Sequence, residues 1–224
     1  MTRPGLSGLV LSAVLLSAAG QIRSAEAHPH IWIDTRAEVE FDQQGRVSEI
    51  RHSWTFDDAF SVFVIQGLDE NQDGLYTRQE LESLAKVNVE SLEEYEFFTF
   101  MGVEVADVDF SDPTDYWLDF DADLSRLTLN FTLPLKRPAA VNEKLILEVF
   151  DPESYVAFAV KEQDSITLAS SAPDACSIEV KPAEDMGEEF AAALAELPAD
   201  QREVPPEFYA VTSQLSNSAI IRCP

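Results

Sequence analysis

One segment of twelve residues has the residue types and spacing of a calcium-binding loop. It runs from Asp69 to Glu80, with Gly74 at the sixth position, where the chain must turn with a positive φ. Ca²⁺ takes about six to eight oxygen ligands, and alternate residues of a tight loop can direct their oxygens inward. The predicted ligands are five side chains and one backbone carbonyl, namely Asp69, Asn71, Asp73, Thr77 and Glu80, with the carbonyl of Leu75. A single loop of this kind favours a structural ion, bound at about 10⁻⁴ to 10⁻³ M, over a calcium sensor.

The three histidines of the chain give a second set of candidate metal ligands. His28 and His30 are two residues apart, so on a strand their imidazoles point to the same face, about 6.6 Å apart. If an export signal is removed after Ala27, the amine of His28 adds a third nitrogen, and such a set suits Zn, Cu or Ni. His52 is the weaker candidate, because a hairpin turn near residue 45 places it opposite about residue 37, some 20 Å from His28.

Other readings of the histidines stay open. A tetrahedral zinc site would need a carboxylate, for which Asp57, Asp58 and Asp151 are candidates. Pro29 has no amide N–H, which argues against a square-planar amino-terminal copper or nickel site. His28 and His30 at a frayed chain end could also be solvated and bind nothing, and His52 could be a hydrogen-bonded structural histidine.

Two further features predict export from the cytoplasm. Residues 6–19 are apolar but too short to span a bilayer, and Ala25-Glu26-Ala27 is a small-x-small cleavage site, so we expect residues 1–27 to be a signal peptide and the mature protein to be periplasmic. Cys176 and Cys223 are the only cysteines, and in an exported chain such a pair predicts a disulfide. Closing a loop of about 47 residues stabilises the fold by roughly 4 kcal/mol.

The charge of the chain narrows the classes of partner. Its formal net charge of −26 repels nucleic acid and anionic membranes, whose recognition needs Lys and Arg, and it attracts cations. The sequence contains neither a nucleophile elbow nor a glycine-rich phosphate-binding loop, and its histidines are clustered at one end. We therefore expect no enzyme activity, no nucleic-acid binding and no insertion into a membrane.

The elements that would position these residues change in type along the chain. Alternating apolar residues predict a hairpin over 30–41 and 47–56, and helical spacing follows over 57–68 and 77–95, on either side of the calcium loop. Further strands are expected at 97–105, 116–120, 127–133, 145–150, 156–160, 166–169 and 218–222, with a helix at 185–197 and with Pro134 and Pro138 as the bounds of a connection. The predicted fold is α+β: one domain, residues 28–224, mainly antiparallel and sandwich-like, with an EF-hand helical hairpin inserted at about 57–95.

Several segments together resemble a known family. They are His28–Asp34, His52–Asp57, Gln66–Asp69 at the start of the calcium loop, Leu84–Asn88, Tyr95–Thr99 and Phe150–Pro152. Over most of the mature chain the sequence resembles a bacterial domain-of-unknown-function family described as the periplasmic component of an ABC-type transport system. Members are often encoded beside inner-membrane permeases of the nickel/cobalt type, and some are linked to zinc. Some relatives carry long His-rich tracts, which this chain lacks.

The resemblance implies a periplasmic protein that binds a transition metal, zinc first, and assists its delivery to an inner-membrane permease. Copper binding, or a copper enzyme that uses the amino-terminal histidine as a chelate, is an alternative of a different class. A second alternative is a non-catalytic interaction module that calcium stabilises.

Overall fold

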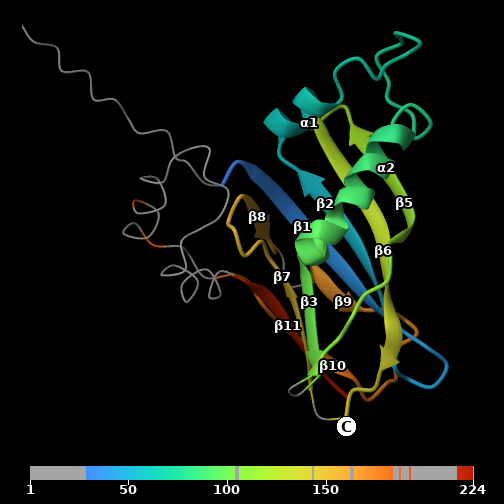
Figure 1. Ribbon diagram of the computed structural model, residues 1–224, viewed down its shortest axis with the longest axis vertical. Helices are drawn as coiled ribbons and strands as arrows, with labels where there is room; N and C mark the ends of the chain where they lie inside the picture. The colour runs from blue at the N-terminus through green and yellow to red at the C-terminus, as the bar shows by residue number, and fades with distance from the viewer. Residues whose placement is uncertain are drawn as a thin grey trace, which may run out of the picture.

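Most of the described part of the chain is β-structure, arranged in two sheets (Figure 1). The computed structural model describes residues 29–103, 106–142, 144–161, 164–183, 187, 192 and 216–223. The expected signal peptide, His28 and most of the helix predicted at 185–197 lie outside these residues.

The larger sheet contains the hairpin predicted at the start of the mature chain. Its strands lie in the order β5-β6-β2-β1-β8, and β9 also pairs with β1. The bounds are β1 (Ile31–Phe41), β2 (Val47–Phe56), β5 (Thr114–Asp121), β6 (Arg126–Ala139), β8 (Val156–Ala159) and β9 (Ile166–Leu168). β1 and β2 are antiparallel with Ala37 opposite His52, which confirms the predicted register, whereas β1 runs parallel to β8 and β9.

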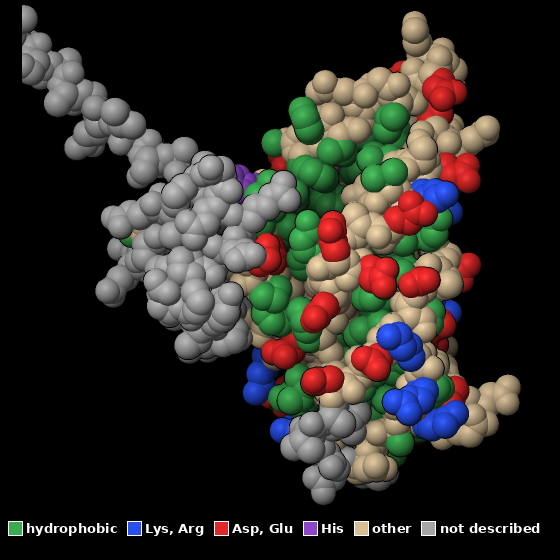
Figure 2. Space-filling model, viewed as in Figure 1, with side chains coloured by type: hydrophobic (Ala, Val, Ile, Leu, Met, Phe, Trp, Pro, Cys, Tyr) green, Lys and Arg blue, Asp and Glu red, His purple; other side chains and the backbone are tan. Residues whose placement is uncertain are grey.

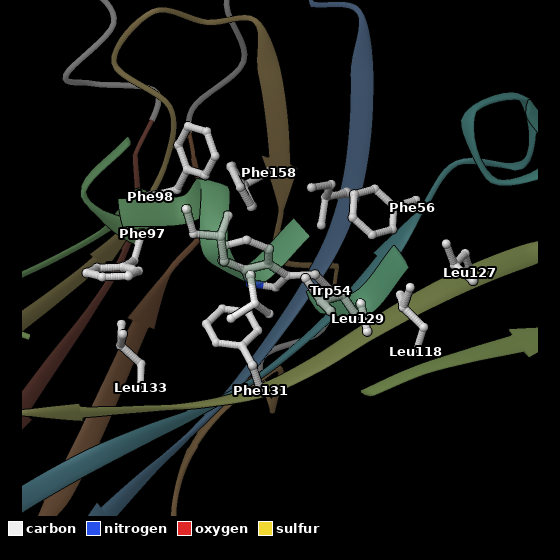
Figure 3. Packing of buried hydrophobic residues seen from close by; sticks show 14 of the residues in the cluster. Trp54, Phe56, Phe97, Phe98, Leu118, Leu127, Leu129, Phe131, Leu133 and Phe158 are labelled. Carbon is white, nitrogen blue, oxygen red and sulfur yellow. The ribbon is translucent and has the colours of Figure 1, made fainter. Parts of the chain in front are cut away.

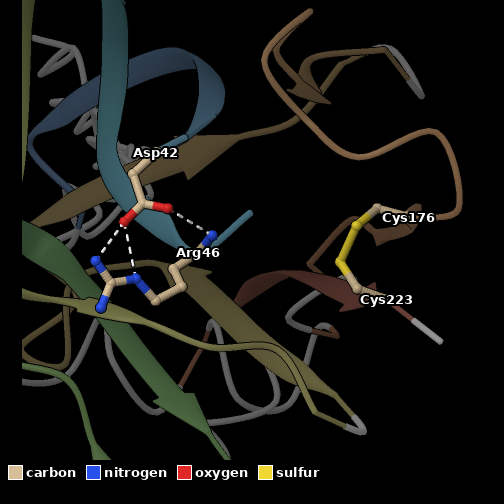
Figure 4. The surroundings of a disulfide bond; sticks show 4 residues. All are labelled: Asp42, Arg46, Cys176 and Cys223. Atoms are coloured by element: carbon tan, nitrogen blue, oxygen red, sulfur yellow. Dashed lines mark hydrogen bonds and ion pairs between the residues drawn. A yellow bond between two sulfur atoms is a disulfide. The ribbon is translucent and has the colours of Figure 1, made fainter. Parts of the chain in front are cut away.

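The smaller sheet is antiparallel throughout the pairs that the structure describes. Its order is β10-β11-β7-β3-β4. The bounds are β3 (Thr99–Val103), β4 (Ala106–Asp107), β7 (Leu145–Val149), β10 (Ser177–Lys181) and β11 (Asn217–Arg222). The predicted disulfide is confirmed: Cys176, just before β10, is bonded to Cys223, just after β11 (Figure 4). The sequence did not indicate β10.

Two hydrophobic clusters form the core, one at each end of the larger sheet. In the first, Val39 and Ile50 of the larger sheet pack against Leu147 and Ile221 of the smaller one, so the two sheets cover each other there. In the second, the other end of the larger sheet is covered by helical segments and holds Trp54 and many of the aromatic side chains (Figure 3).

The helical segments are α1 (Asp58–Val64), α2 (Glu82–Ser91) and the 3₁₀ segment η1 (Leu92–Phe98). Asp57 caps α1, because its side chain accepts a hydrogen bond from the amide of Phe60 at 2.8 Å. No helix of the described residues is long and apolar enough to cross a membrane.

The prediction of an α+β fold with an EF-hand helical hairpin is wrong. The described chain is β-rich with two short α-helices, and neither reaches the acidic loop Asp69–Glu80. α1 stops at Val64, and Gly67 then takes a φ of +83°, which continues no helix. On the other side, residues 78–81 form turns, and α2 begins only at Glu82.

The strand predicted at 127–133 is longer than expected, because β6 continues through Pro134 and Pro138 to Ala139. The pairing of β2 with β6 shifts register between Val47 and Glu49, and Glu49 is the partner of Pro134. A proline lacks the donor of a regular ladder and is tolerated at such an irregularity. The prediction that Pro134 and Pro138 bound a connection is therefore wrong, because both lie within β6.

Candidate metal and ligand sites

The acidic loop Asp69–Glu80 is curled by hydrogen bonds from its own backbone amides to the predicted ligands. The Asp69 carboxylate accepts from the amide of Asp73 at 3.2 Å and from that of Gly74 at 3.0 Å. The side-chain oxygen of Asn71 accepts from Asp73 at 2.8 Å, and the Asp73 carboxylate accepts from Leu75 at 2.8 Å. Side-chain oxygens of the first, third and fifth loop positions are thus held in one tight turn.

Glu80, the twelfth residue, folds back over this turn. Its carboxylate accepts from the amide of Thr77 at 2.9 Å and from the Thr77 hydroxyl at 2.8 Å. The backbone N–H of Thr77, its hydroxyl and the amides of Glu70 and Asn71 lower the pKa of Glu80, so this carboxyl is ionised at neutral pH. The two ends of the loop therefore meet, and Gly74 has the positive φ, +79°, that its position predicts.

His30 lies at the exposed start of the larger sheet. Its backbone amide donates to the carbonyl of Tyr155 at 2.8 Å, and the two rings are 4.7 Å apart between centroids. The neighbouring His28 lies outside the described residues. The structure therefore places one of the two amino-terminal histidines next to the turn that precedes β8.

His52 is distant from His30 and is enclosed in the core. It pairs with Ala37, seven residues along β1 from His30, which corresponds to about 23 Å. Its ring is stacked on Phe131 with centroids 4.8 Å apart, and it meets Trp54 edge-on. Burial lowers the pKa of His52 from 6.5 to about 3, so the ring is neutral at neutral pH.

The tautomer of His52 follows from its partner. The Thr99 hydroxyl donates its single proton to the carbonyl of Phe97 at 2.8 Å. With that proton engaged, the hydroxyl oxygen, 3.3 Å from Nε2 of His52, is able to accept from this nitrogen, which favours the tautomer with its proton on Nε2. Nδ1 has no hydrogen-bond partner among the described residues. This histidine is a structural core residue, and the structure does not bring it together with His30.

The carboxylates suggested as further metal ligands already accept hydrogen bonds from backbone amides. Asp57 accepts from Trp32 at 3.0 Å in addition to capping α1, and Asp58 accepts from the amide of Ala59 at 2.9 Å. The Asp151 carboxylate accepts from the amides of Glu153 and Val156 at 2.8 and 2.9 Å. Across the described ranges, no three His, Cys, Asp or Glu side chains are grouped so that they could hold a metal ion.

A pocket that the sequence did not indicate lies beside His30, where the end of α2 faces β1, β2 and β8. Its volume is 240 Å³. Most of its wall is formed by aromatic and aliphatic side chains, namely Ile31, Ile33, Trp54, Phe56, Phe60, Leu92, Tyr95, Phe98, Leu129, Tyr155 and Val156. The other lining residues are the polar Asn88, Ser91, Asp151 and Glu153. The period-two pattern of β1 and β2 places Ile31, Ile33, Trp54 and Phe56 on the face of the sheet that lines the pocket. The residues that cover this face belong to segments distant in the sequence, and the sequence does not reveal how those segments pack.

Comparison with known proteins assigns the chain to a protein family but to no individual protein. A family model described as "Protein of unknown function (DUF1007)" matches residues 13–223. No curated protein matches the sequence. The resemblance to a domain-of-unknown-function family is thus confirmed at that level. Because the match extends over nearly the whole chain, the protein belongs to the DUF1007 family of proteins of unknown function.

Proposed function

We propose that this protein is a periplasmic metal-binding protein. Ca²⁺ is held in the acidic loop as a structural ion, and a transition metal, zinc first, is bound through His28 and His30 for delivery to an inner-membrane permease. The observation that carries the proposal is the curled conformation of the acidic loop, in which Asp69, Asn71 and Asp73 occupy one turn and Glu80 folds back onto it.

The chemistry of this loop favours Ca²⁺ over other cations. Its donors are carboxylate, amide, hydroxyl and carbonyl oxygens, which suit a hard cation with a large coordination shell. Asp69, Asp73 and Glu80 do not converge on one point in this conformation, so Ca²⁺ binding requires their side chains to rotate. The amides that now bond to these oxygens leave further lone pairs on each carboxylate, which the rotated side chains can direct to one ion. The lowered pKa of Glu80 keeps the closing carboxylate ionised.

The amino-terminal half of the proposal depends on His30. Its ring is exposed and adjoins Tyr155, in the same turn as the acidic Asp151 and Glu153. Figure 2 shows Asp and Glu side chains spread over one face of the molecule, and the net charge of −26 raises the local concentration of cations around the protein. The disulfide Cys176–Cys223 is compatible with a compartment outside the cytoplasm, in which such an ion would be collected. With His52 in the core, the ligand set proposed here is His28 and His30 alone.

A calcium titration of the mature protein tests the proposed calcium site in the acidic loop. After treatment with a chelator, the wild type should bind one Ca²⁺ per chain in a calorimetric titration, and its Tm should rise with Ca²⁺ concentration. Glu80→Gln should weaken binding by at least about tenfold, because the closing ligand loses its charge. Glu70→Gln removes a charge at a loop position that supplies no ligand and should leave the affinity nearly unchanged. Equal affinities for both variants would contradict the calcium site.

Native mass spectrometry of protein that begins at His28 tests the proposed zinc site at His28 and His30. One Zn²⁺ should add to the wild type in the presence of Ca²⁺, and His30→Ala should lose it. His52→Gln should keep it, provided that the variant is folded. Zinc binding that survives in His30→Ala, or that is absent from the trimmed wild type, would refute the amino-terminal site while leaving the calcium result untouched.

A further inference from the structure

The pocket beside His30 is separate from the two proposed metal sites. None of the residues described around it belongs to the acidic loop, and His30 itself does not line it. An engineered apolar cavity of about 150 Å³ holds one benzene molecule, so a volume of 240 Å³ leaves room for roughly ten heavy atoms. The pocket therefore has the capacity for a small organic molecule with one ring or a branched chain.

The aromatic side chains of the pocket wall are fixed by contacts with one another and with the core. Trp54 meets Phe131 and Phe158 edge-on, with ring centroids 4.8 and 5.0 Å apart (Figure 3). Phe98 is stacked on Tyr95, with centroids 5.1 Å apart. Rings packed in this way are not available to turn inward and fill the space, so the pocket is preformed, as most ligand sites are.

The turn that brings Phe98 to this wall is built at a conformational cost. Three consecutive residues that are not glycine, Glu96, Phe97 and Phe98, have positive φ values of 52°, 55° and 45°. L-residues pay free energy for this left-handed conformation. Such strain is concentrated at active sites and ligand clamps, and here it lies directly beside the pocket.

The pocket offers a ligand no uncommitted charge. No Lys or Arg is among its described lining residues, and its acids are Asp151 and Glu153. The Asp151 carboxylate accepts from the amides of Glu153 and Val156 at 2.8 and 2.9 Å, and Glu153 has a further interaction of its own. A charged group that entered this apolar space would lose its hydration without gaining a free counter-charge, which disfavours anions and cations alike.

Two uncharged polar side chains lie on the α2 side of the pocket. The side-chain nitrogen of Asn88 donates to the carbonyl of Leu84 at 2.8 Å, and the Ser91 hydroxyl donates to the carbonyl of Asn88 at 2.8 Å. The side-chain oxygens of both residues keep lone pairs that can accept a further hydrogen bond. A single hydroxyl on a ligand therefore has acceptors at this side.

We infer that this pocket binds a small uncharged organic molecule: an aromatic or branched apolar body that carries at most one hydroxyl group. The body lies against Ile33, Trp54 and Phe98, and the hydroxyl donates to Asn88 or Ser91 beside the end of α2.

Three probes of nearly identical shape test the preference for a neutral ligand: 4-phenylbutan-1-ol, 4-phenylbutylamine and 4-phenylbutyrate. Calorimetry and ligand-observed NMR measure the binding of each to the protein that begins at His28. We expect the alcohol to bind at least about fivefold more tightly than either ion, with the same affinity at low and high salt. An ion that binds as tightly as the alcohol, or an alcohol that does not bind, would overturn the inference.

A pair of tryptophan variants on α2 tests whether the alcohol binds in this pocket. Ser91 is exposed and lines the pocket, so Ser91→Trp should fill the mouth and abolish binding of the alcohol. Val87→Trp adds the same side chain at a residue that is 63% exposed and does not line the pocket, and it should leave the affinity unchanged. Alcohol binding that withstands Ser91→Trp in a variant with the wild-type Tm would refute the site.

Intermolecular NOEs locate the ligand in the wild-type protein, without any substitution. The phenyl protons of the bound alcohol should give NOEs to the methyl groups of Ile31 and Ile33, which line the pocket. NOEs from the bound alcohol to methyl groups elsewhere, with none to these two residues, would show that it binds at another place and would contradict the inference.

Discussion

Arg78 and Asp119 form a double hydrogen-bonded ion pair that fastens the acidic loop to β5, the edge strand of the larger sheet. Nε of Arg78 is 2.8 Å from Oδ1 of Asp119, and its second contact, from a terminal nitrogen to Oδ2, is 3.1 Å. The guanidinium also lies over the ring of Trp117, at 4.7 Å from its centroid. Beside this pair, Tyr76 meets Phe120 edge-on, so the loop has both a polar and an apolar attachment to the same strand.

Removal of this attachment should act on the loop more than on the fold. Both partners are about half exposed or more, so Arg78→Ala should cost about 1 kcal/mol or less of the free energy of unfolding. Because the loop loses its anchor, its Ca²⁺ affinity should fall by about two- to fivefold. Urea unfolding and calcium titration measure the two effects. Arg137→Ala, an exposed cation on β6, is the control, and equal calcium affinities for the two variants would contradict the coupling.

The buried His52 should make the fold sensitive to mild acid. Its pKa in the folded state, about 3, is below its ordinary value of 6.5, so between these values the unfolded chain binds a proton that the folded chain does not. The contribution of the neutral His52 to the free energy of unfolding should therefore be fully present above about pH 6.5 and should fall steadily as the pH is lowered toward 3. Urea unfolding at pH 7, 6 and 5 measures this before most carboxylates titrate.

The variant His52→Leu keeps the volume and removes the titrating group. It should lose a hydrogen bond to Thr99 and some stability at pH 7, but its free energy of unfolding should change much less than that of the wild type between pH 7 and pH 5. Parallel pH profiles for the two proteins would rule out His52 as the source of the acid sensitivity.

Asn217 should be among the most sensitive polar residues of the fold. It is 1% exposed; its side-chain oxygen accepts from the amides of Val160 and Ala183, and its side-chain nitrogen donates to the carbonyls of Val149 and Phe158. Asn217→Ala leaves these groups without that partner and should cost about 3 to 5 kcal/mol.

The neighbouring substitution Ser218→Ala, on the same strand, should cost about 0.5 kcal/mol or less. Denaturant unfolding of both variants gives the comparison. A loss below about 1 kcal/mol for Asn217→Ala would show that water replaces the amide in this position.

The disulfide should stabilise the fold by restricting the unfolded chain. Cys176 and Cys223 are separated by 47 residues, which corresponds to about 4 kcal/mol in the chain-entropy model. Replacement of both cysteines by serine should lower the urea midpoint accordingly, and addition of a reductant should shift the wild type to the same midpoint while leaving the variant unchanged. A reductant effect on the variant would trace the loss to something other than the disulfide.

Local patterns predicted the first hairpin well because its turn is specified by adjacent residues. Asp42 accepts from the amides of Gln44 and Arg46, and it is paired with the Arg46 guanidinium (Figure 4). The backbone amide of Arg46, its guanidinium and the amide of Gln44 lower the pKa of Asp42. Gly45 supplies the positive φ of +72°. With the turn fixed, the alternation of apolar residues set the register, and His52 lies opposite Ala37 as predicted.

The helix lengths, strand β10 and the pocket depend on contacts between segments that are distant in the sequence. The acidic loop was recognised from its own residues, whereas the length of α1 and α2 was overestimated, because helical spacing continued past Val64 and past Ser91. β10 carries a weak alternation at the edge of its sheet and gave no clear signal. The pocket could not be predicted, since Tyr95, Asp151 and Tyr155 reach β1 only through long-range packing.

The parallel pairing of β1 with β8 and β9 has a consequence for how the chain reaches its native state. β1, the first strand of the described chain, has β2 on one edge and acquires the neighbours on its other edge only from residues 156–168, more than a hundred positions later. Sequence separations of this size slow the closure of a sheet. Until residues 156–168 have been synthesised, β1 therefore has a neighbour on one edge alone, and the larger sheet cannot be completed while the chain is still growing.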